Sequence, residues 1–291
     1  MEKPLILVTG GNGQLGNELK QLTLAYPQFE FVFTDIDDLA LDNFKLVGDF
    51  FAEHQPAYCI NCAAYTAVDK AETNRDVVML VNGTVVGNLA AVCKKYSTRF
   101  LHVSTDYVFD GESTVPYKED DVPNPSNVYG ESKLLGEQLC LKEDPSSIII
   151  RTAWVYSSFG NNFVKTMMRL MAERPELNVV SDQVGSPTYA ADLAKAIMDI
   201  IASAKWEGGI YHYSNEGRIS WYDFAVAIKK QIGSECVVNP IPTSAYPTPA
   251  KRPQYSLLNK EKIKTVYGVQ VPEWETSLEK CISLLIQKPL S

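Results

Sequence analysis

Histidine is scarce in this sequence. Only three histidines occur, His54, His102 and His212, and no two of them are spaced as a pair of metal ligands. We therefore find no histidine-based metal site. The sequence also lacks a run of the roughly 18 to 20 apolar residues that a membrane-spanning helix needs. The apolar segment within MEKPLILVTG is about five residues long, too short for a signal peptide. We expect a cytoplasmic protein that does not bind a membrane.

Positive charge is scarce as well. Lysine and arginine number 27 against 35 acidic residues, which gives a formal net charge of −8. An acidic surface disfavours non-specific binding to nucleic acids and anionic lipids, so we expect no nucleic-acid partner and favour a small-molecule ligand. The six cysteines are scattered, which suits reduced thiols better than a disulfide framework. Cys59 and Cys62 form a CxxC pair, but residues three apart in a predicted strand point to opposite faces, so we expect structural burial.

Short apolar runs alternate with helical segments along the first half of the chain. The predicted strands lie in LILVTG, FEFVFTD, AYCINCAAY, RFLHVSTD and SSIIIRTAWVY. Helices are expected at residues 13–26, 42–54 and 75–96 and in YGESKLLGEQLCLK. Strands and helices that alternate at this spacing predict an α/β fold with a doubly wound, Rossmann-type parallel sheet. We assign residues 1–155 to a dinucleotide-binding domain.

The alternation weakens after about residue 155. We assign residues 156–291 mainly to a smaller substrate-binding lobe, with LNVVSD and GIYHYS as candidate strands that return to the main sheet. The proline-rich stretch NPIPTSAYPTPAKRP, residues 239–253, is more aromatic and less charged than a linker. We expect it to be a binding loop.

A glycine-rich turn follows the first predicted strand. TGGNGQLGNEL places Gly10, Gly13 and Gly16 between strand and helix, where glycine permits a tight turn and close approach of a pyrophosphate to the helix N-terminus. Asp35 ends the next strand, where its carboxylate can bind the adenosine ribose, and no arginine follows closely. The pattern predicts a dinucleotide site that favours NADH over NADPH. Asp42 is either close to the adenine or the N-cap of the next helix.

The stretch NVYGESK places Tyr129 and Lys133 four residues apart on one helical face. A nearby ammonium lowers the pKa of a phenol, so the pair suits a proton donor for carbonyl reduction. In HVSTD, Ser104 and Thr105 lie at the carboxyl end of a predicted strand, where a hydroxyl can hold the substrate carbonyl. Taken alone, these residues also fit a solvated surface pair and a strand-end turn.

Several motifs together resemble the extended short-chain dehydrogenase/reductase superfamily and, within it, the dTDP-4-dehydrorhamnose reductase family. They cover residues 9 to about 259 and read TGGNGQLG, NCAAYTAVDKAE, STDYVFDG, NVYGESK, RTAWVY, GNNFVKTM, DQVGSPT and PTSAYPTPAKRP. The resemblance implies a nucleotide-sugar substrate. The implied reaction is reduction of the C4 ketone of dTDP-4-dehydro-6-deoxy-L-mannose (dTDP-4-dehydro-β-L-rhamnose) to dTDP-L-rhamnose, with NADPH or NADH as cofactor.

The resemblance also implies residue roles. Tyr129 would donate the proton, Lys133 would lower its pKa and bind the nicotinamide ribose, and Thr105 would hold the substrate with Asp106 beside it. Trp154 would contact the sugar. The remaining implied cofactor contacts are Gly13, Gln14 and Leu15 at the pyrophosphate and Ala63, Ala64 and Tyr65 along the cofactor channel, where Cys62 departs slightly from the family pattern. Some family members are described with magnesium bridging a dimer, but Mg²⁺ cannot be placed on residues of this sequence, and a homodimer stays an open expectation.

For four later residues the sequence alone also suggests a role. Trp154 follows a strand and fits either stacking on a sugar ring or packing in the core. Arg252 fits a guanidinium fork on a nucleotide pyrophosphate or a solvated loop charge. Lys165 and Arg169 suit an exposed helix face better than a ligand site.

Two rival functions stay open. A nucleotide-sugar epimerase or 4,6-dehydratase shares the fold and the Tyr-Lys pair, but a dehydratase of this superfamily has an acidic pair after the catalytic threonine, and here Tyr107 follows Asp106. A regulatory subunit that resembles that of methionine adenosyltransferase would be a binding module. The intact set of Thr105, Tyr129 and Lys133 favours catalysis over that second reading.

Overall fold

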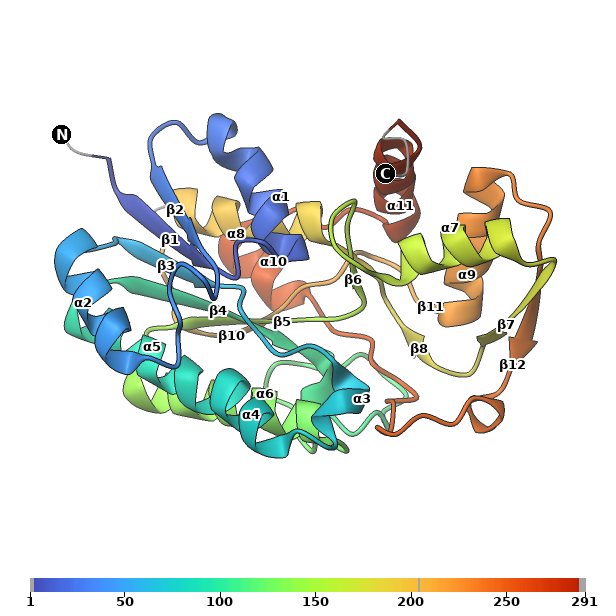
Figure 1. The fold of residues 1–291 in the computed structure, drawn as a ribbon, viewed down its shortest axis with the longest axis horizontal. Helices are drawn as coiled ribbons and strands as arrows, with labels where there is room; N and C mark the ends of the chain where they lie inside the picture. Colours follow the sequence, from blue (N-terminus) through green and yellow to red (C-terminus); the bar gives the residue numbers. More distant parts are fainter. Residues whose placement is uncertain (1–2, 204, 288–291) are drawn as a thin grey trace.

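A computed structural model describes residues 3–203 and 205–287. At its centre lies a six-stranded sheet in the order β10-β5-β4-β3-β1-β2, in which every neighbouring pair is parallel (Figure 1). The strands are β1 (Leu5–Thr9), β2 (Glu30–Thr34), β3 (Tyr58–Asn61), β4 (Arg99–Thr105), β5 (Ile148–Thr152) and β10 (Gly209–His212). The doubly wound fold expected from the alternating runs is confirmed.

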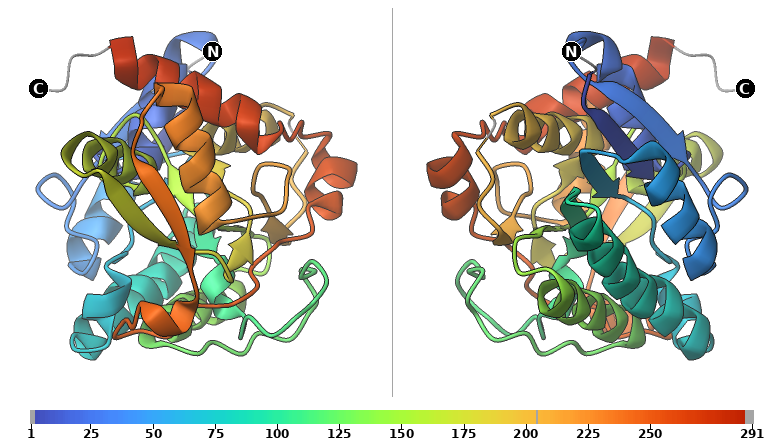
Figure 2. Two further views of the ribbon diagram at one scale, coloured as in Figure 1. Left: turned by 90° about the vertical axis from the view of Figure 1, so that its right-hand side faces the viewer. Right: turned by 90° about the vertical axis from the view of Figure 1, so that its left-hand side faces the viewer.

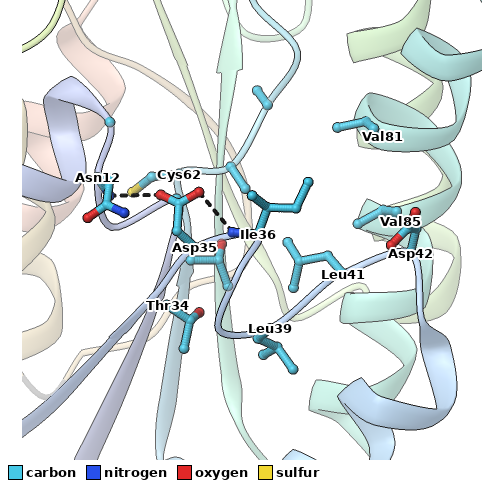
Figure 3. A pocket seen from close by; sticks show the side chains of 15 residues that line it. Asn12, Thr34, Asp35, Ile36, Leu39, Leu41, Asp42, Cys62, Val81 and Val85 are labelled. Carbon is cyan, nitrogen blue, oxygen red and sulfur yellow. Dashed lines mark hydrogen bonds between the residues drawn. The ribbon is translucent and has the colours of Figure 1, made fainter.

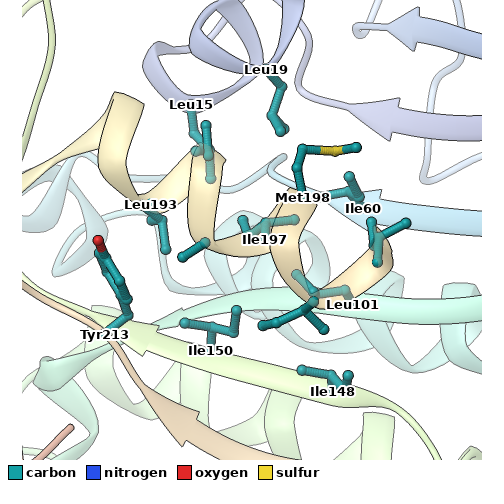
Figure 4. Packing of buried hydrophobic residues seen from close by; sticks show 14 of the residues in the cluster. Leu15, Leu19, Ile60, Leu101, Ile148, Ile150, Leu193, Ile197, Met198 and Tyr213 are labelled. Atoms are coloured by element: carbon teal, nitrogen blue, oxygen red, sulfur yellow. The ribbon is translucent and has the colours of Figure 1, made fainter. Parts of the chain in front are cut away.

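Helices cover both faces of the sheet, which explains why its strands are apolar at consecutive positions. Ile6 and Val8 of β1 face α1 (Gln14–Leu22), α8 (Ala190–Ala202) and α10 (Glu261–Tyr267), and Figure 4 shows this layer. Leu7 faces the opposite layer, which contains α2 (Phe44–His54), α5 (Val85–Lys95) and α6 (Val128–Glu143). The strand's side chains therefore alternate between two cores.

The longest helical stretch runs from Arg75 to Lys95. It comprises α4 (Arg75–Met79), the π-helical turn η2 (Leu80–Thr84) and α5, close to the predicted limits of 75–96. Its 21 residues include a window of mean hydropathy 1.6, so by length and composition it could cross a membrane, and the expectation that no stretch is this long was wrong. Half of that window is buried in the fold, as in a core helix. A Cβ on Gly83 or Gly87 would collide with leucines of α6.

The second half of the chain, apart from α8, β10 and α10, forms a lobe at the carboxyl edge of the sheet (Figures 1 and 2). Its core lies among α7 (Phe163–Glu173), α9 (Trp221–Ile232) and α11 (Trp274–Gln287). Three two-stranded sheets complete it: β7 (Glu176–Val180) with β12 (Val237–Ile241), β8 (Val184–Gly185) with β11 (Ile219–Ser220), and β6 (Val155–Tyr156) with β9 (Thr188–Tyr189).

Only one of the two candidate returning strands joins the main sheet. GIYHYS contains β10, which extends the sheet beside β5, as expected. LNVVSD contains β7, which pairs with β12 instead, so that expectation was wrong. The physical reason lies in the burial pattern: β7 alternates between exposed and buried residues, whereas β5 is buried throughout and has helices on both faces. The domain limit at residue 155 stays a prediction, because α8 and β10 lie in the layers of the main sheet.

The proline-rich stretch at 239–253 is anchored to residues of the first half of the chain. The Asn127 side-chain amide, at the start of α6, donates to the Lys251 carbonyl oxygen at 2.9 Å. The Ala250 amide donates to the Asp69 carboxylate at 3.2 Å, and Asp69 belongs to α3 (Val68–Ala71). The stretch is therefore a docked segment beside α6, and its first residues form part of β12.

Candidate active site

A cavity of about 520 Å³ opens at the carboxyl edge of β1, β2 and β3 (Figure 3). The chain turns at Gly10, which has φ +65°, and a Cβ there would lie 2.7 Å from the Ala63 amide nitrogen. Only glycine lets the two loops approach this closely. The predicted residues that line the cavity are Gly10, Gly13, Asp35, Asp42, Ala63 and Ala64.

Asp35 is held firmly in the cavity wall. Its carboxylate accepts hydrogen bonds from the Asn12 and Ile36 backbone amides, each at 2.9 Å (Figure 3). Lys20 of α1 places its Nζ 3.1 Å from the side-chain oxygen of Asn12, the residue whose backbone amide binds Asp35. Lys20 was not among the predicted residues, because only an arginine after Asp35 was considered as a partner for a 2′-phosphate.

Asp42 lines the cavity and does not cap α2. Asn43 is the N-cap, because its side-chain oxygen accepts from the Leu46 amide at 3.1 Å. The N-cap alternative for Asp42 was therefore wrong. Cys62, which we had expected to serve structural burial, is a half-buried free thiol on the cavity wall.

Besides Tyr129 and Lys133, four predicted cofactor residues do not line the cavity. Gly16 allows close packing, since a Cβ there would lie 2.4 Å from the Gly10 carbonyl oxygen. The Leu15 side chain is buried in the core between α1 and α8. The Gln14 side-chain oxygen accepts from the Asn162 amide at 3.0 Å, and the Tyr65 backbone amide donates to the Asn82 side chain at 2.8 Å. Of these four, Gln14 and Leu15 still offer backbone N–H groups at the start of α1.

The N-terminus of α6 places the predicted catalytic pair. Asn127 caps the helix by accepting from the Gly130 amide at 2.8 Å, so Tyr129 and Lys133 fall in its first two turns, beside the end of β4. The Tyr129 ring packs edge-on against Tyr107 at a centroid distance of 5.5 Å. Burial raises the pKa of Tyr129 to about 12, and the hydrogen bond between Tyr129 and the Thr105 hydroxyl opposes that shift.

Lys133 is almost completely buried. Its Nζ donates to the Val103 carbonyl oxygen at 2.7 Å and lies 3.2 Å from His102 Nε2. Burial lowers the pKa of Lys133 to about 8, and the negative charge of Glu137 opposes the shift. The sequence reading did not single out His102, although it lies in the quoted stretch HVSTD.

Two polar groups at the end of β4 are buried without a hydrogen-bond partner among the described residues. They are the Ser104 hydroxyl and one oxygen of the Asp106 carboxylate. The other Asp106 oxygen accepts from the Thr105 hydroxyl at 3.0 Å. Burial raises the pKa of Asp106 to about 6, although hydrogen bonds from Thr105 and Ser256 oppose the shift. Such unpaired groups are expected where a ligand supplies the missing partner.

Trp154 is neither in the core nor fully open. Its backbone adopts φ +49°, a rare conformation for a bulky residue. Its indole stacks on that of Trp221, with 3.7 Å between the ring centroids and an interplanar angle of 13°. Trp221 is the first residue of α9, which Ser220 and Asp223 start with a capping box. The sequence reading missed Trp221. One face of Trp154 is thus already occupied.

The Arg252 guanidinium binds other groups of the protein. Its Nη2 lies 2.9 Å from the Asp69 carboxylate, its Nη1 donates to the Ala250 carbonyl oxygen at 2.9 Å, and its side chain is 21% exposed. The alternative of a solvated loop charge was therefore wrong. Arg169, on the exposed side of α7, pairs with Glu173 at 2.9 Å, in keeping with a helix face, and Lys165 lies one turn earlier on the same helix.

Within residues 3–203 and 205–287, no group of three or more His, Cys, Asp or Glu side chains is placed to hold a metal ion. These described residues therefore offer no such cluster for Mg²⁺.

The comparisons with known proteins agree with this geometry. The family model described as "RmlD substrate binding domain" matches residues 4–286. A dTDP-4-dehydrorhamnose reductase of Aggregatibacter actinomycetemcomitans is 42% identical and covers 94% of this chain and 97% of its own. Among solved structures, a dTDP-4-dehydrorhamnose reductase of Clostridium acetobutylicum has a TM-score of 0.93 at 42% identity and covers 97% and 99% of the two chains.

A second solved structure includes a cofactor. The dTDP-4-dehydrorhamnose reductase of Bacillus anthracis, in complex with NADP, has a TM-score of 0.93 at 38% identity and covers 97% of this chain and 100% of its own. These matches extend over both lobes and are well above the level at which only a fold is shared. The chain therefore belongs to the RmlD substrate binding domain family, whose members include the named dTDP-4-dehydrorhamnose reductases.

Proposed function

We propose that this protein reduces the C4 ketone of dTDP-4-dehydro-6-deoxy-L-mannose to dTDP-L-rhamnose, with NADPH or NADH as the reductant. One observation carries the proposal: Tyr129 is hydrogen-bonded to Thr105, and Lys133 follows one turn later on α6, at the carboxyl edge of the sheet that also holds the dinucleotide cavity. The names of the relatives in the same family support the choice of substrate.

Residues of this chain would donate the proton that the reaction needs. The cofactor supplies the hydride. Thr105 and Tyr129 bind the C4 oxygen with their hydroxyls, and Tyr129 gives its proton to that oxygen as the hydride arrives. The phenolate that forms is unfavourable in a buried site, and the Lys133 ammonium stabilises it. Lys133 would also hold the nicotinamide ribose.

The cavity fits the adenosine end of a nicotinamide dinucleotide. Gly10 and Gly13 leave room for the pyrophosphate at the start of α1, and Asp35 faces the position of the ribose hydroxyls. A 2′-phosphate would meet the Asp35 carboxylate but also the nearby Lys20 ammonium. We propose that both cofactors bind and that NADH is preferred. The NADP bound in the Bacillus anthracis relative supports use of NADPH as well.

Substrate contacts follow from residues at the same edge. The free face or edge of Trp154 would pack on the 6-deoxy sugar, and Asp106 and Ser104 offer unpaired buried groups to it. Arg252, fixed by Asp69, would place its remaining N–H donors towards the nucleotide pyrophosphate. We further propose that the protein acts in the cytoplasm; whether it forms a homodimer is a question for light scattering.

The test is cofactor oxidation with the 4-keto nucleotide sugar, followed by identification of the product. We expect loss of nicotinamide absorbance and formation of dTDP-L-rhamnose. An epimerase or dehydratase would retain its NAD and convert other nucleotide sugars without net oxidation of added NADH. A regulatory subunit would bind cofactor without turnover and would copurify with a methionine adenosyltransferase. Either of these two outcomes would contradict the proposed reductase function.

A further inference from the structure

A chain of buried polar side chains crosses three strands beneath the catalytic lysine. Thr9, Asn61 and His102 are register neighbours on β1, β3 and β4, and the His102 ring reaches Lys133 of α6. All four side chains are almost completely buried. Because water is excluded here, each hydrogen-bonding group must find its partner within the chain.

The orientation of Asn61 is fixed by a backbone group. Its side-chain oxygen accepts from the Thr9 hydroxyl at 2.7 Å and from the Ala63 backbone amide at 3.2 Å. A backbone N–H can only donate, so the oxygen must face Ala63 and the amide nitrogen must face the other way. That nitrogen lies 3.0 Å from His102 Nδ1.

The orientation of Asn61 in turn fixes the tautomer of His102. An amide NH₂ can only donate, so His102 Nδ1 must be the acceptor and the single proton of the neutral ring must be on Nε2. Burial holds the pKa of His102 well below its usual range, and the nearby Lys133 charge adds to this, so the ring stays neutral. The Nε2–H group therefore points at Lys133 Nζ, 3.2 Å away.

A donor facing an ammonium favours loss of the lysine proton. An ammonium has three N–H donors and no acceptor, whereas the neutral amine can accept the Nε2–H hydrogen bond. We propose that His102 is a positioning residue: its ring, held by Asn61 as the Nε2–H tautomer, presents a fixed donor to Lys133 and so sets the protonation equilibrium of that lysine. The inference rests on the function proposed above for Tyr129 and Lys133.

The other chargeable groups around Lys133 act differently. Cys62 from the segment after β3 and Glu137 from α6 both favour the charged lysine. Glu137 is held by Arg151 of β5, with Nη2 at 2.7 Å and Nε at 2.9 Å from its two oxygens. Tyr129 lies one turn before Lys133 on α6. Among these groups, His102 alone presents an N–H donor to the lysine nitrogen.

The tautomer can be observed directly. With ¹⁵N-histidine, the chain gives signals from only three histidines, and the His102 signals are assigned by their loss in His102→Phe. We expect an unprotonated Nδ1 and a protonated Nε2 that do not change between about pH 5 and pH 9. An Nδ1–H tautomer, or an imidazolium in this range, would overturn the proposal. This readout needs no substrate.

The effect on Lys133 is tested by reversing the tautomer. In Asn61→Asp a carboxylate accepts from Nδ1–H, so the Nε2 lone pair faces Lys133 and stabilises the ammonium. We expect the basic limb of the pH profile of kcat/KM to move up by about one pH unit. In Asn61→Asp combined with His102→Phe most of this shift should disappear, because it acts through the ring. An equal shift with and without His102 would show a direct charge effect and contradict the proposal.

His212→Phe is the matched control. His212 is also a fully buried histidine, but it lies on β10 with its Nδ1 3.2 Å from the Tyr117 carbonyl oxygen. Its loss should affect stability and leave the basic limb in place. If the wild-type protein does not oxidise cofactor with the 4-keto sugar, the proposed function has failed, and the tautomer result still decides this inference alone. If the wild type turns over and the His102 tautomer is Nδ1–H, only this inference fails.

Discussion

At the scale of the single residue, the site combines groups whose ordinary chemistry is altered by burial. Tyr129 and Asp106 bind their protons more tightly than in water, whereas Lys133 releases its proton more readily. All three shifts have desolvation as their largest cause, because burial penalises the charged form of each group. Residue substitutions therefore test both catalysis and stability.

The first residue-scale prediction concerns the proton donor. Tyr129→Phe removes the phenolic hydroxyl and keeps the ring that packs on Tyr107. We expect kcat to fall by about 100- to 10,000-fold while the Kd for NADH changes little. Stopped-flow turnover and fluorescence titration measure the two quantities. Unchanged kcat would exclude Tyr129 as the proton donor.

Asp35 tests the cofactor preference. Asp35→Ala removes the carboxylate that would accept from the ribose hydroxyls and repel a 2′-phosphate, so the KM for NADH should rise about tenfold while that for NADPH should change little or fall. Lys20→Ala is the opposing control, since it removes the ammonium bound to Asn12 and should weaken the binding of NADPH. An equal loss for both cofactors in Asp35→Ala would contradict a ribose contact.

Asp106 gives a prediction for stability against pH. Its folded pKa is raised from 3.8 to about 6, so its protonated form favours the folded state below pH 4, and that contribution is lost as the pH rises through 6. The side chain of Asp106→Asn stays neutral at every pH. At pH 7 the free energy of unfolding of this variant should therefore exceed that of the wild type by about 1–3 kcal/mol. Urea titrations should show this advantage vanish near pH 4. An advantage independent of pH would refute the ionisation argument.

At the scale of the element, the position of α6 decides the geometry of the site. Its approach to the π-helical turn η2 is so close that a Cβ on Gly136 would lie 2.1 Å from the Asn82 carbonyl oxygen. Asn82 also binds the Tyr65 backbone and the Ser132 hydroxyl, so this contact links the segment after β3 to α6, the helix of the proposed catalytic pair.

Gly136→Ala should therefore lower the free energy of unfolding by at least about 2 kcal/mol, because backbone atoms cannot yield as a side chain can. Gly48→Ala in α2 is the matched control, with no atom within 4 Å of the new Cβ. It should raise the free energy of unfolding by about 0.5–1 kcal/mol. Denaturant titration of both variants provides the comparison, and a neutral Gly136→Ala would disprove the close packing.

The elements differ in how far the sequence predicted them. Strands buried on both faces were found from their apolar runs, and the catalytic helix from its motif. LNVVSD was misplaced because pairing partners far apart in sequence, here β7 and β12, leave no local signal. Within the site, Asp35 followed from strand position, but His102 and Trp221 did not, since their roles depend on neighbours brought together only by the fold.

At the scale of the whole molecule, the two lobes are connected across the site. Asp69 of the first half binds both the Ala250 amide and the Arg252 guanidinium of the proline-rich stretch, next to the N-terminus of α6. The proposed substrate site therefore depends on residues about 180 positions apart in the chain. The same segment is held by Asn127, the cap of the catalytic helix.

Arg252→Gln should raise the KM for the nucleotide sugar about tenfold or more and leave the Kd for NADH unchanged, because we propose that the guanidinium binds the pyrophosphate of the sugar nucleotide. Lys251→Gln is the neighbouring control: its Nζ is 3.9 Å from Glu112 and its side chain is 61% exposed, so its effect should be small. Steady-state kinetics with both variants distinguishes a specific pyrophosphate contact from a general loss of positive charge. Equal effects would argue against the contact.

The most direct test of the central claim is isotope transfer from the cofactor. The reduced cofactor carries deuterium on C4 of the nicotinamide, in the position that is transferred as hydride. With this cofactor and the 4-keto nucleotide sugar, we predict dTDP-L-rhamnose that carries one deuterium at C4 of the sugar, detected by mass spectrometry and NMR. Tyr129→Phe should form the same labelled product more slowly. A product without deuterium, or no product while cofactor still binds, would contradict the claim that this protein is a reductase.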